Sequence, residues 1–170
     1  MSCEVSWFSA LCDDDYEFLG VPDPKLKSSW EHCRDIVLGA EAGGFDNVLL
    51  PSGYALGIDA TAFAAGIAVL TRQIRLLLAV RVEGVRRQAE LRAGAGDEGY
   101  VEDNLWTGIG RAWSGCGAAI VGDPDQVLAK LAAYQAMGIE AFILSGYPHA
   151  AEADLFARHV LPRMPHGPLA

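Results

Sequence analysis

The sequence predicts an α/β fold built on a parallel sheet covered by helices. Short apolar runs without polar alternation recur along the chain, as expected for strands that are buried on both faces. Amphipathic helical patterns separate most of these runs, and a strand–helix–strand order is typical of parallel β/α units. The five strands are expected at residues 4–9, 47–50, 74–80, 118–121 and 141–144.

Two helices are expected between the first three strands. The first begins at about Ser29 and is ended by Gly43 and Gly44, because glycine is the usual residue just after a helix. The second has Asp59 as its N-cap. The apolar residues expected to face the core are Trp30, Cys33, Val37 and Ala40 in the first helix and Phe63, Ile67 and Leu70 in the second.

The regular alternation fails after the third strand. A third helix could begin within residues 86–92, but glycines interrupt it, and the stretch AGAGDEG is typical of a flexible connection. We therefore expect a single truncated domain with a seam. Its parts are the N-terminal β/α units in 1–91, the seam in 92–103, the C-terminal β/α units in 104–163 and a tail in 164–170.

Two further helices follow the seam. Asp123 is the expected N-cap of the first, Pro124 occupies its first position, and Gly138 ends it. The second should run from about Ala150 to Leu161, after the last strand. This part of the chain therefore repeats the β/α order of the N-terminal part.

The composition excludes several classes of partner. The chain is 51% hydrophobic and 21% charged, as expected for a globular protein with a substantial core. Its formal net charge of −9 would repel nucleic acids and anionic membrane surfaces. No apolar run reaches the length of a membrane span, and the N-terminus lacks the basic start of a signal peptide, so we expect a cytoplasmic protein.

The cysteines and the acidic run predict no metal site. Cys3, Cys12, Cys33 and Cys116 form no CxxC pair, so buried or half-buried thiols are expected rather than a zinc site or a disulfide framework. Residues 13–15 are three consecutive aspartates. Consecutive carboxylates do not converge easily on one ion, so we expect a solvated loop there.

The loops that leave the C-terminal ends of parallel strands are the expected place for a functional site, because such loops build the active sites of β/α folds. The segments expected at that edge are 10–20, 51–58, 81–86, 122–123 and 145–149.

Two blocks of the sequence carry a resemblance to a known family. The C-terminal block is NLWTGIGRAWSGCGAAIVGDPDQVLAKLAAYQAMGIEAFILSGYPHAAEA, residues 104–153, and the N-terminal block contains AGGFDNVLLPSG, LTRQIRLLLAVR and RQAEL. These motifs resemble the reduced-flavin-dependent alkanesulfonate monooxygenases of the bacterial luciferase-like superfamily. Together the two blocks cover about five sixths of the chain.

The resemblance implies a partial (β/α) TIM-type barrel, because the two blocks are separated in the family by the middle of the barrel. The five strands would be barrel strands in the order 7-8-1-2-3. Such a sheet leaves two edge strands and the inner barrel face uncovered. We therefore expect a homo-oligomer, or else low stability.

The resemblance also implies a reaction. Reduced flavin (FMNH2), delivered by an NAD(P)H-dependent flavin reductase, would react with dioxygen and an alkanesulfonate, and the C–S bond would be cleaved to give an aldehyde and sulfite. A second interpretation is a non-catalytic half-barrel, a relic or a binding and oligomerisation module that no longer turns over.

The SGYPH motif provides two candidate site residues. By the resemblance, Tyr147 is a catalytic residue that lines the site, and its phenol can donate a hydrogen bond to an oxygen atom of a substrate. The alternative is that Tyr147 and Pro148 only turn the chain into the last helix. His149 is a candidate for substrate binding, and the alternative is a residue of the helix cap region.

Two arginines are candidates for binding an anion such as a sulfonate. Arg81 follows the third strand, where the family also has arginine, and its alternative role is a salt bridge. By the resemblance, the family has an active-site arginine where this chain has Trp113, so Arg111 could serve only as a displaced substitute for it. Other family site residues align near Leu56 and near Leu11 or Cys12, and the residues that bind the flavin phosphate belong to the missing middle, so no cofactor-binding residue is assigned.

Overall fold

The computed structural model describes residues 3–18, 20–52, 57–79, 100–106 and 119–168. The contacts divide the chain into two compact units, which are described separately. The first unit consists of Met1–Arg81 and Gly138–Ala170, and the second of Val82–Met137. None of the helices in the described part is long and apolar enough to cross a membrane.

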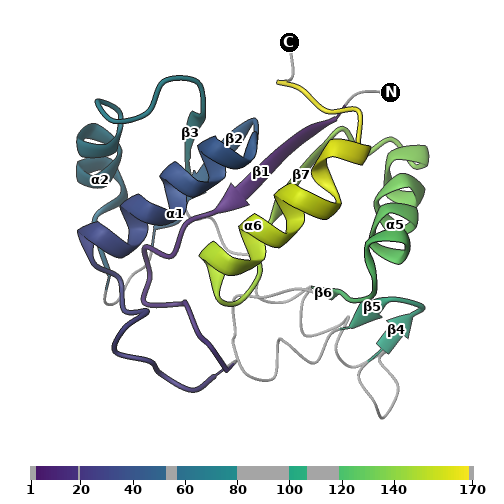
Figure 1. The fold of residues 1–170 in the computed structure, drawn as a ribbon, viewed down its shortest axis with the longest axis horizontal. Coiled ribbons are helices and arrows are strands. Elements are labelled where there is room, and N and C mark those ends of the chain that lie inside the picture. Colours follow the sequence, from purple (N-terminus) through teal and green to yellow (C-terminus); the bar gives the residue numbers. More distant parts are fainter. Residues whose placement is uncertain (1–2, 19, 53–56, 80–99, 107–118, 169–170) are drawn as a thin grey trace. The chain divides into compact units, whose positions relative to one another are not determined.

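The first unit contains a four-stranded parallel sheet in the order β3-β2-β1-β7 (Figure 1). Its strands are β1 (Glu4–Phe8), β2 (Asn47–Leu50), β3 (Arg75–Leu78) and β7 (Ala141–Leu144). Trp7 of β1 is in register with Val48 on one side and Leu144 on the other. The predicted α/β class is therefore confirmed, and so is the predicted adjacency of the last strand and the first three.

Helices α1 (Trp30–Gly43) and α6 (His149–His159) lie side by side over one face of this sheet (Figure 1). Ser29 caps α1 by accepting a hydrogen bond from the His32 backbone N–H, and Gly44 ends it at a φ of 85°, which glycine adopts without strain. The aromatic core between helices and sheet centres on Trp7, whose ring lies 5.2 Å from Phe45 and 6.2 Å from Phe156 of α6. A 3-10 turn, η1 (Leu161–Arg163), follows α6.

Helix α2 (Ala60–Ile67) begins, as predicted, after Asp59, whose side chain accepts a hydrogen bond from the Ala62 backbone N–H. Phe63 and Ile67 are buried, and Phe63 packs against Trp30 of α1 with ring centroids 5.2 Å apart. The prediction for Leu70 was wrong, because α2 ends before this residue and its side chain is 46% exposed.

The second unit contains a small antiparallel sheet in the order β4-β5-β6, formed by β4 (Tyr100–Glu102), β5 (Leu105–Trp106) and β6 (Ala119–Ile120). The strand predicted at residues 118–121 was therefore wrong as a member of the parallel sheet, since residues 119–120 pair antiparallel with β5. Asn104 explains this pairing. Its φ of 62° turns the chain from β4 into β5, and its side-chain amide donates to the Val121 carbonyl at 2.8 Å.

Helix α5 (Pro124–Ala136) follows β6 and confirms the predicted start. Asp123 and Gln126 form a capping box, in which each side chain accepts from the backbone N–H of the other residue, and Pro124 is the first helical residue. The possible helix in 86–92 lies outside the described residues, and the expectation of one truncated domain stays a prediction.

Candidate functional site

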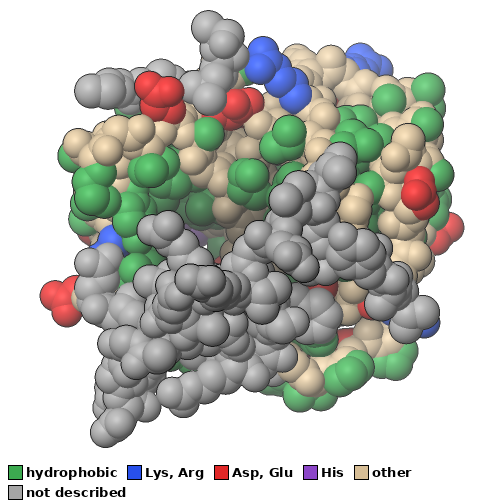
Figure 2. All heavy atoms as spheres, turned by 180° about the vertical axis from the view of Figure 1, so that it is seen from behind, with side chains coloured by type: hydrophobic (Ala, Val, Ile, Leu, Met, Phe, Trp, Pro, Cys, Tyr) green, Lys and Arg blue, Asp and Glu red, His purple; other side chains and the backbone are tan. Residues whose placement is uncertain are grey.

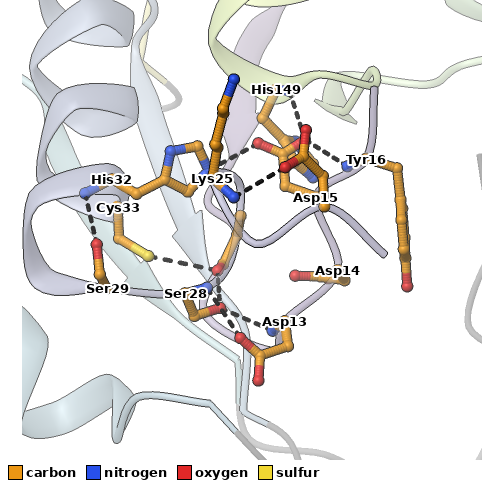
Figure 3. Close-up of polar contacts among 12 residues, drawn as sticks. Asp13, Asp14, Asp15, Tyr16, Lys25, Ser28, Ser29, His32, Cys33 and His149 are labelled. Atoms are coloured by element: carbon orange, nitrogen blue, oxygen red, sulfur yellow. Dashed lines mark hydrogen bonds and ion pairs between the residues drawn. The ribbon is translucent and has the colours of Figure 1, made fainter. Parts of the chain in front are cut away.

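The loop that follows β1 and the loop that precedes α6 meet at the C-terminal edge of the parallel sheet (Figure 3). The first loop contains Asp13, Asp14, Asp15 and Tyr16, and the second contains Tyr147 and Pro148. Rings from both loops are in contact: the centroids of Tyr16 and Tyr147 lie 5.7 Å apart. Two of the loops that the sequence predicts at the functional edge are thus brought together.

The β1 loop is held in place by reciprocal hydrogen bonds between its two ends. The Asp13 N–H donates to Ser28 Oγ at 2.7 Å, and the Ser28 N–H donates to Asp13 Oδ1 at 2.8 Å. The Leu11 carbonyl accepts from the Ile58 N–H at 2.9 Å. Gly57 is required at that contact, because a Cβ atom there would lie 2.1 Å from the Leu11 carbonyl oxygen.

Two of the three consecutive aspartates are buried, so the prediction of a solvated loop was wrong. Asp14 is 4% exposed and Asp15 is 3% exposed. The physical reason is that the three carboxylates point to different partners: Asp13 to Ser28, Asp14 to the Cys12 N–H, and Asp15 to α1 and α6. Backbone donors and a histidine compensate their loss of water.

Asp14 and His149 are shifted toward their neutral forms. Burial raises the pKa of the Asp14 carboxyl to about 6, although hydrogen bonds from the backbone oppose this shift. Burial lowers the pKa of His149 to about 4, against the opposing influence of Asp15 and of the Asp14 backbone. At neutral pH the site therefore contains an uncharged imidazole.

His149 is enclosed, and its ring nitrogens are unsatisfied. The residue is 0% exposed, and neither Nδ1 nor Nε2 has a partner with good hydrogen-bond geometry among the described residues, although the Asp14 backbone lies close enough to act on the pKa of the imidazole. Phe8 stacks on the imidazole with centroids 5.4 Å apart, and Tyr147 meets it edge-on at 5.0 Å. Buried polar atoms are normally paired. These two nitrogens are thus an unused donor and an unused acceptor directly behind Tyr147.

Tyr147 is half-buried and follows a glycine that no other residue can replace without movement. A Cβ atom at Gly146 would lie 2.5 Å from Cβ of Glu152. This close approach brings the SGYPH segment against the first turn of α6. The phenol is therefore the outer group of the pair, and the imidazole is the inner one.

The structure brings Tyr147 and His149 together, and their predicted roles stay predictions. Arg81, Arg111, Trp113 and Leu56 lie outside the described residues. Leu11 is fully buried and Cys12 is half-buried beside the aspartate run. Cys3 and Cys33 are also buried, and none of these three cysteines forms a disulfide within the described part.

Sequence reasoning missed Asp15 and His32. His32 Nε2 lies 2.8 Å from Asp15 Oδ2, and Asp15 Oδ1 also accepts the His149 backbone N–H at 2.9 Å. One signal was present: His32 is one residue before the buried Cys33 in the first turn of α1, close to the sheet edge where the site was expected. The partner in the aspartate run could not be chosen from the sequence.

Two known proteins are similar to the chain over nearly its whole length. A sulfoquinovose monooxygenase from Novosphingobium aromaticivorans is 35% identical, and the alignment covers 99% of this chain and 98% of that protein. A sulfoquinovose monooxygenase from Agrobacterium fabrum is 29% identical, with 96% and 90% covered. No protein-family model matches the chain.

Proposed function

The chain belongs to the luciferase-like monooxygenase family of these sulfoquinovose monooxygenases, and from this premise we propose that it is a reduced-flavin-dependent monooxygenase that cleaves the C–S bond of an organosulfonate. The similarity to the two relatives carries this proposal. Their shared name favours sulfoquinovose over a simple alkanesulfonate as the substrate. We infer that a separate NAD(P)H-dependent reductase supplies the flavin.

The proposed reaction balances as a monooxygenation. The C–S bond breaks, sulfite leaves, and the carbon is oxidised to an aldehyde that keeps one atom of dioxygen, while the other atom becomes water. FMNH2, when bound, supplies the two electrons and the activation of dioxygen, and is released as FMN. What the chain itself must supply is binding, orientation and exclusion of water.

Tyr147 fits the role of the residue that contacts the substrate. Its phenol can donate a hydrogen bond to a sulfonate oxygen and to the departing sulfite, and this bond requires no charge on the protein. The half-buried ring lies at the sheet edge between Tyr16 and His149. Because the phenol is neutral, it can donate this bond and stabilise the negative charge that develops on the leaving sulfite.

His149 fits a role behind Tyr147. Its two unsatisfied nitrogens support the presence of a polar group at this edge, since a ligand atom or a water molecule would pair them. Direct contact between the imidazole and a substrate requires movement of the Tyr147 ring, because His149 is fully enclosed.

Sulfite release tests the proposal. The full chain, supplied with a flavin reductase, NADH, FMN and dioxygen, is expected to release sulfite from sulfoquinovose and less from octanesulfonate. Tyr147→Phe should lower kcat by about 100- to 1,000-fold, the range for loss of one positioned donor to developing negative charge. His159→Gln is the matched control, because His159 is exposed on α6 and should change nothing.

The alternative is a half-barrel that binds or associates without turnover. The exposed side chains of Leu77 and Ile143 on the parallel sheet favour it, because side chains of this kind would be packed in the interior of a complete barrel. Absence of sulfite together with absence of fluorescence quenching in an anaerobic titration with FMNH2 would support this alternative and end the enzyme proposal for the isolated chain.

A further inference from the structure

The carboxylate of Asp15 connects three segments of the first unit (Figure 3). Its Oδ1 accepts hydrogen bonds from the backbone N–H groups of Tyr16 and His149, both at 2.9 Å. Its Oδ2 pairs with Nε2 of His32 on α1 at 2.8 Å, and the side chain is completely buried. A buried carboxylate with three hydrogen-bond partners is held in one geometry, because a buried charge that loses partners is costly.

Helix α6 depends on this carboxylate at its N-terminus. The N-cap residue is Pro148, which provides no side-chain hydrogen bond, and His149 is the first helical residue. The backbone N–H of His149 has no acceptor within the helix, as is usual in a first helical turn. It donates instead to Asp15 of the β1 loop. The positive end of the helix dipole also favours a carboxylate at this place.

The other backbone group of His149 is anchored as well. Its carbonyl oxygen accepts from Nε1 of Trp7 at 3.1 Å, within the core. Asp15 and Trp7 together fix the peptide units on both sides of the His149 Cα atom. The rings of His149 and Tyr147, which meet at 5.0 Å, take their position from this backbone.

We propose that Asp15 is a positioning residue for Tyr147: by accepting the His149 backbone N–H, with His32 holding its second oxygen, it sets where the SGYPH segment presents the phenol. The expected effect of Asp15 on catalysis rests on the proposed function, whereas its effect on the position of Tyr147 does not. Asp15 itself is not expected to contact the substrate.

Three variants separate positioning from general destabilisation. Asp15→Ala removes all acceptors. Asp15→Asn keeps an amide oxygen that can still accept from His149 and Tyr16, so it is the conservative rescue. Asp13→Ala is the matched control: it disrupts the same loop through its bonds with Ser28 and has no bond to α6.

The expected results differ between the variants. Asp15→Ala should lower kcat for sulfite release by about 10- to 100-fold, because small misplacements of a reacting group have effects of that size. Its KM should stay within about twofold, and Asp15→Asn should recover most of kcat. Asp13→Ala should keep kcat within about threefold. Equal losses in Asp13→Ala and Asp15→Ala, or no recovery in Asp15→Asn, would overturn the proposal.

A second readout does not need activity. Hydrogen exchange followed by NMR should show at least about tenfold faster exchange of the His149 amide in Asp15→Ala, which has no side-chain acceptor, with the Gly44 amide unchanged. The ring signals of Tyr147 should shift in the same variant. Unchanged exchange and unchanged ring signals would reject the positioning role. A wild-type chain that releases no sulfite would end the proposed function alone, and the NMR comparison would still decide the role of Asp15.

Discussion

The ring of Phe8 stacks on the imidazole of His149, with centroids 5.4 Å apart and planes inclined by 20°. Phe8 ends the first strand of the sheet, and His149 begins helix α6, so the contact joins the N-terminal and C-terminal parts of the first unit. The apolar ring shields this face of the imidazole from water. The enclosure explains why the imidazole is neutral at physiological pH.

The buried His149 should make the stability depend on pH. Its pKa is about 4 in the folded chain and about 6.5 when unfolded, so the unfolded chain binds more protons between these values. The free energy of unfolding should therefore fall as pH decreases from 6.5 to 4, and His149 should account for about 3 kcal/mol of this decrease.

Urea unfolding at a series of pH values measures this dependence. His149→Gln should remove the slope that belongs to His149, whereas His159→Gln, at an exposed position of the same helix, should keep it. An unchanged slope in His149→Gln would contradict a neutral buried imidazole.

Asp14 should act in the opposite direction. Its pKa is about 6 when folded and 3.8 when the chain is unfolded, so the folded chain binds more protons between these values. Stability from this residue is fully present below pH 3.8 and is lost as pH rises through 6. Asp14→Asn should therefore increase the free energy of unfolding at pH 8 by about 1–3 kcal/mol, and change it little at a pH of about 3.5.

The control for Asp14 is Asp35→Asn, an exposed position on α1 that should alter stability by less than about 0.5 kcal/mol. Thermal unfolding at both pH values is sufficient for the comparison. A loss of stability in Asp14→Asn at pH 8 would mean that the charged carboxylate is better solvated than its burial indicates.

The regular elements of the fold could be predicted because they have a local cause. Apolar runs, the N-caps Ser29, Asp59 and Asp123, and the glycine after α1 determine where helices and strands begin and end. The pairing of residues 119–120 could not be predicted in this way. A two-residue strand has little pattern, and its partner is selected by the turn at Asn104.

The residues of the candidate site also differ in whether a local sequence pattern identifies them. Tyr147 and His149 are recognisable because they lie in a motif directly after a strand. Asp15 is not, because consecutive aspartates indicate a polar loop in sequence, and the donors that make burial tolerable come from 17 and 134 residues away. Only the tertiary structure supplies that compensation.

Glu41 should stabilise the connection between α2 and β3. Its Oε1 accepts hydrogen bonds from the backbone N–H groups of Arg72, Gln73 and Ile74, at 2.8, 2.7 and 3.0 Å. These bonds lower the pKa of Glu41. Its stabilising contribution is therefore present above the ordinary glutamate pKa and is lost as the pH falls through the folded value.

Glu41→Ala should reduce the free energy of unfolding at pH 7 by about 1–2 kcal/mol, a discounted value because the carboxylate is partly accessible to water. Glu41→Gln keeps an acceptor and should lose about half as much. Glu31→Gln, on the exposed side of the same helix, is the control. Equal stability of Glu41→Ala and the wild type at pH 7 would show that water replaces the carboxylate without loss.

The face of the parallel sheet opposite α1 and α6 should take part in self-association. By the alternation along the strands, Leu77 of β3 and Ile143 of β7 lie on this face, opposite to the side that carries Trp7, and they remain 42% and 50% exposed. Figure 2 shows hydrophobic side chains at several places on the molecule seen from behind. Exposed apolar area of this kind is stabilised by contact with a second apolar surface.

Light scattering coupled to gel filtration tests this prediction. The wild-type chain should have a mass above that of one chain at micromolar concentration, and the double variant Leu77→Lys, Ile143→Lys should have the mass of a monomer, because two charges at the centre of an apolar contact lose their hydration without gaining partners. Leu70→Lys is the matched control, since Leu70 is similarly exposed but lies after α2, outside the sheet. A wild-type chain that stays monomeric at tens of micromolar would contradict the prediction, and the exposed leucine and isoleucine would then be tolerated by the monomer itself.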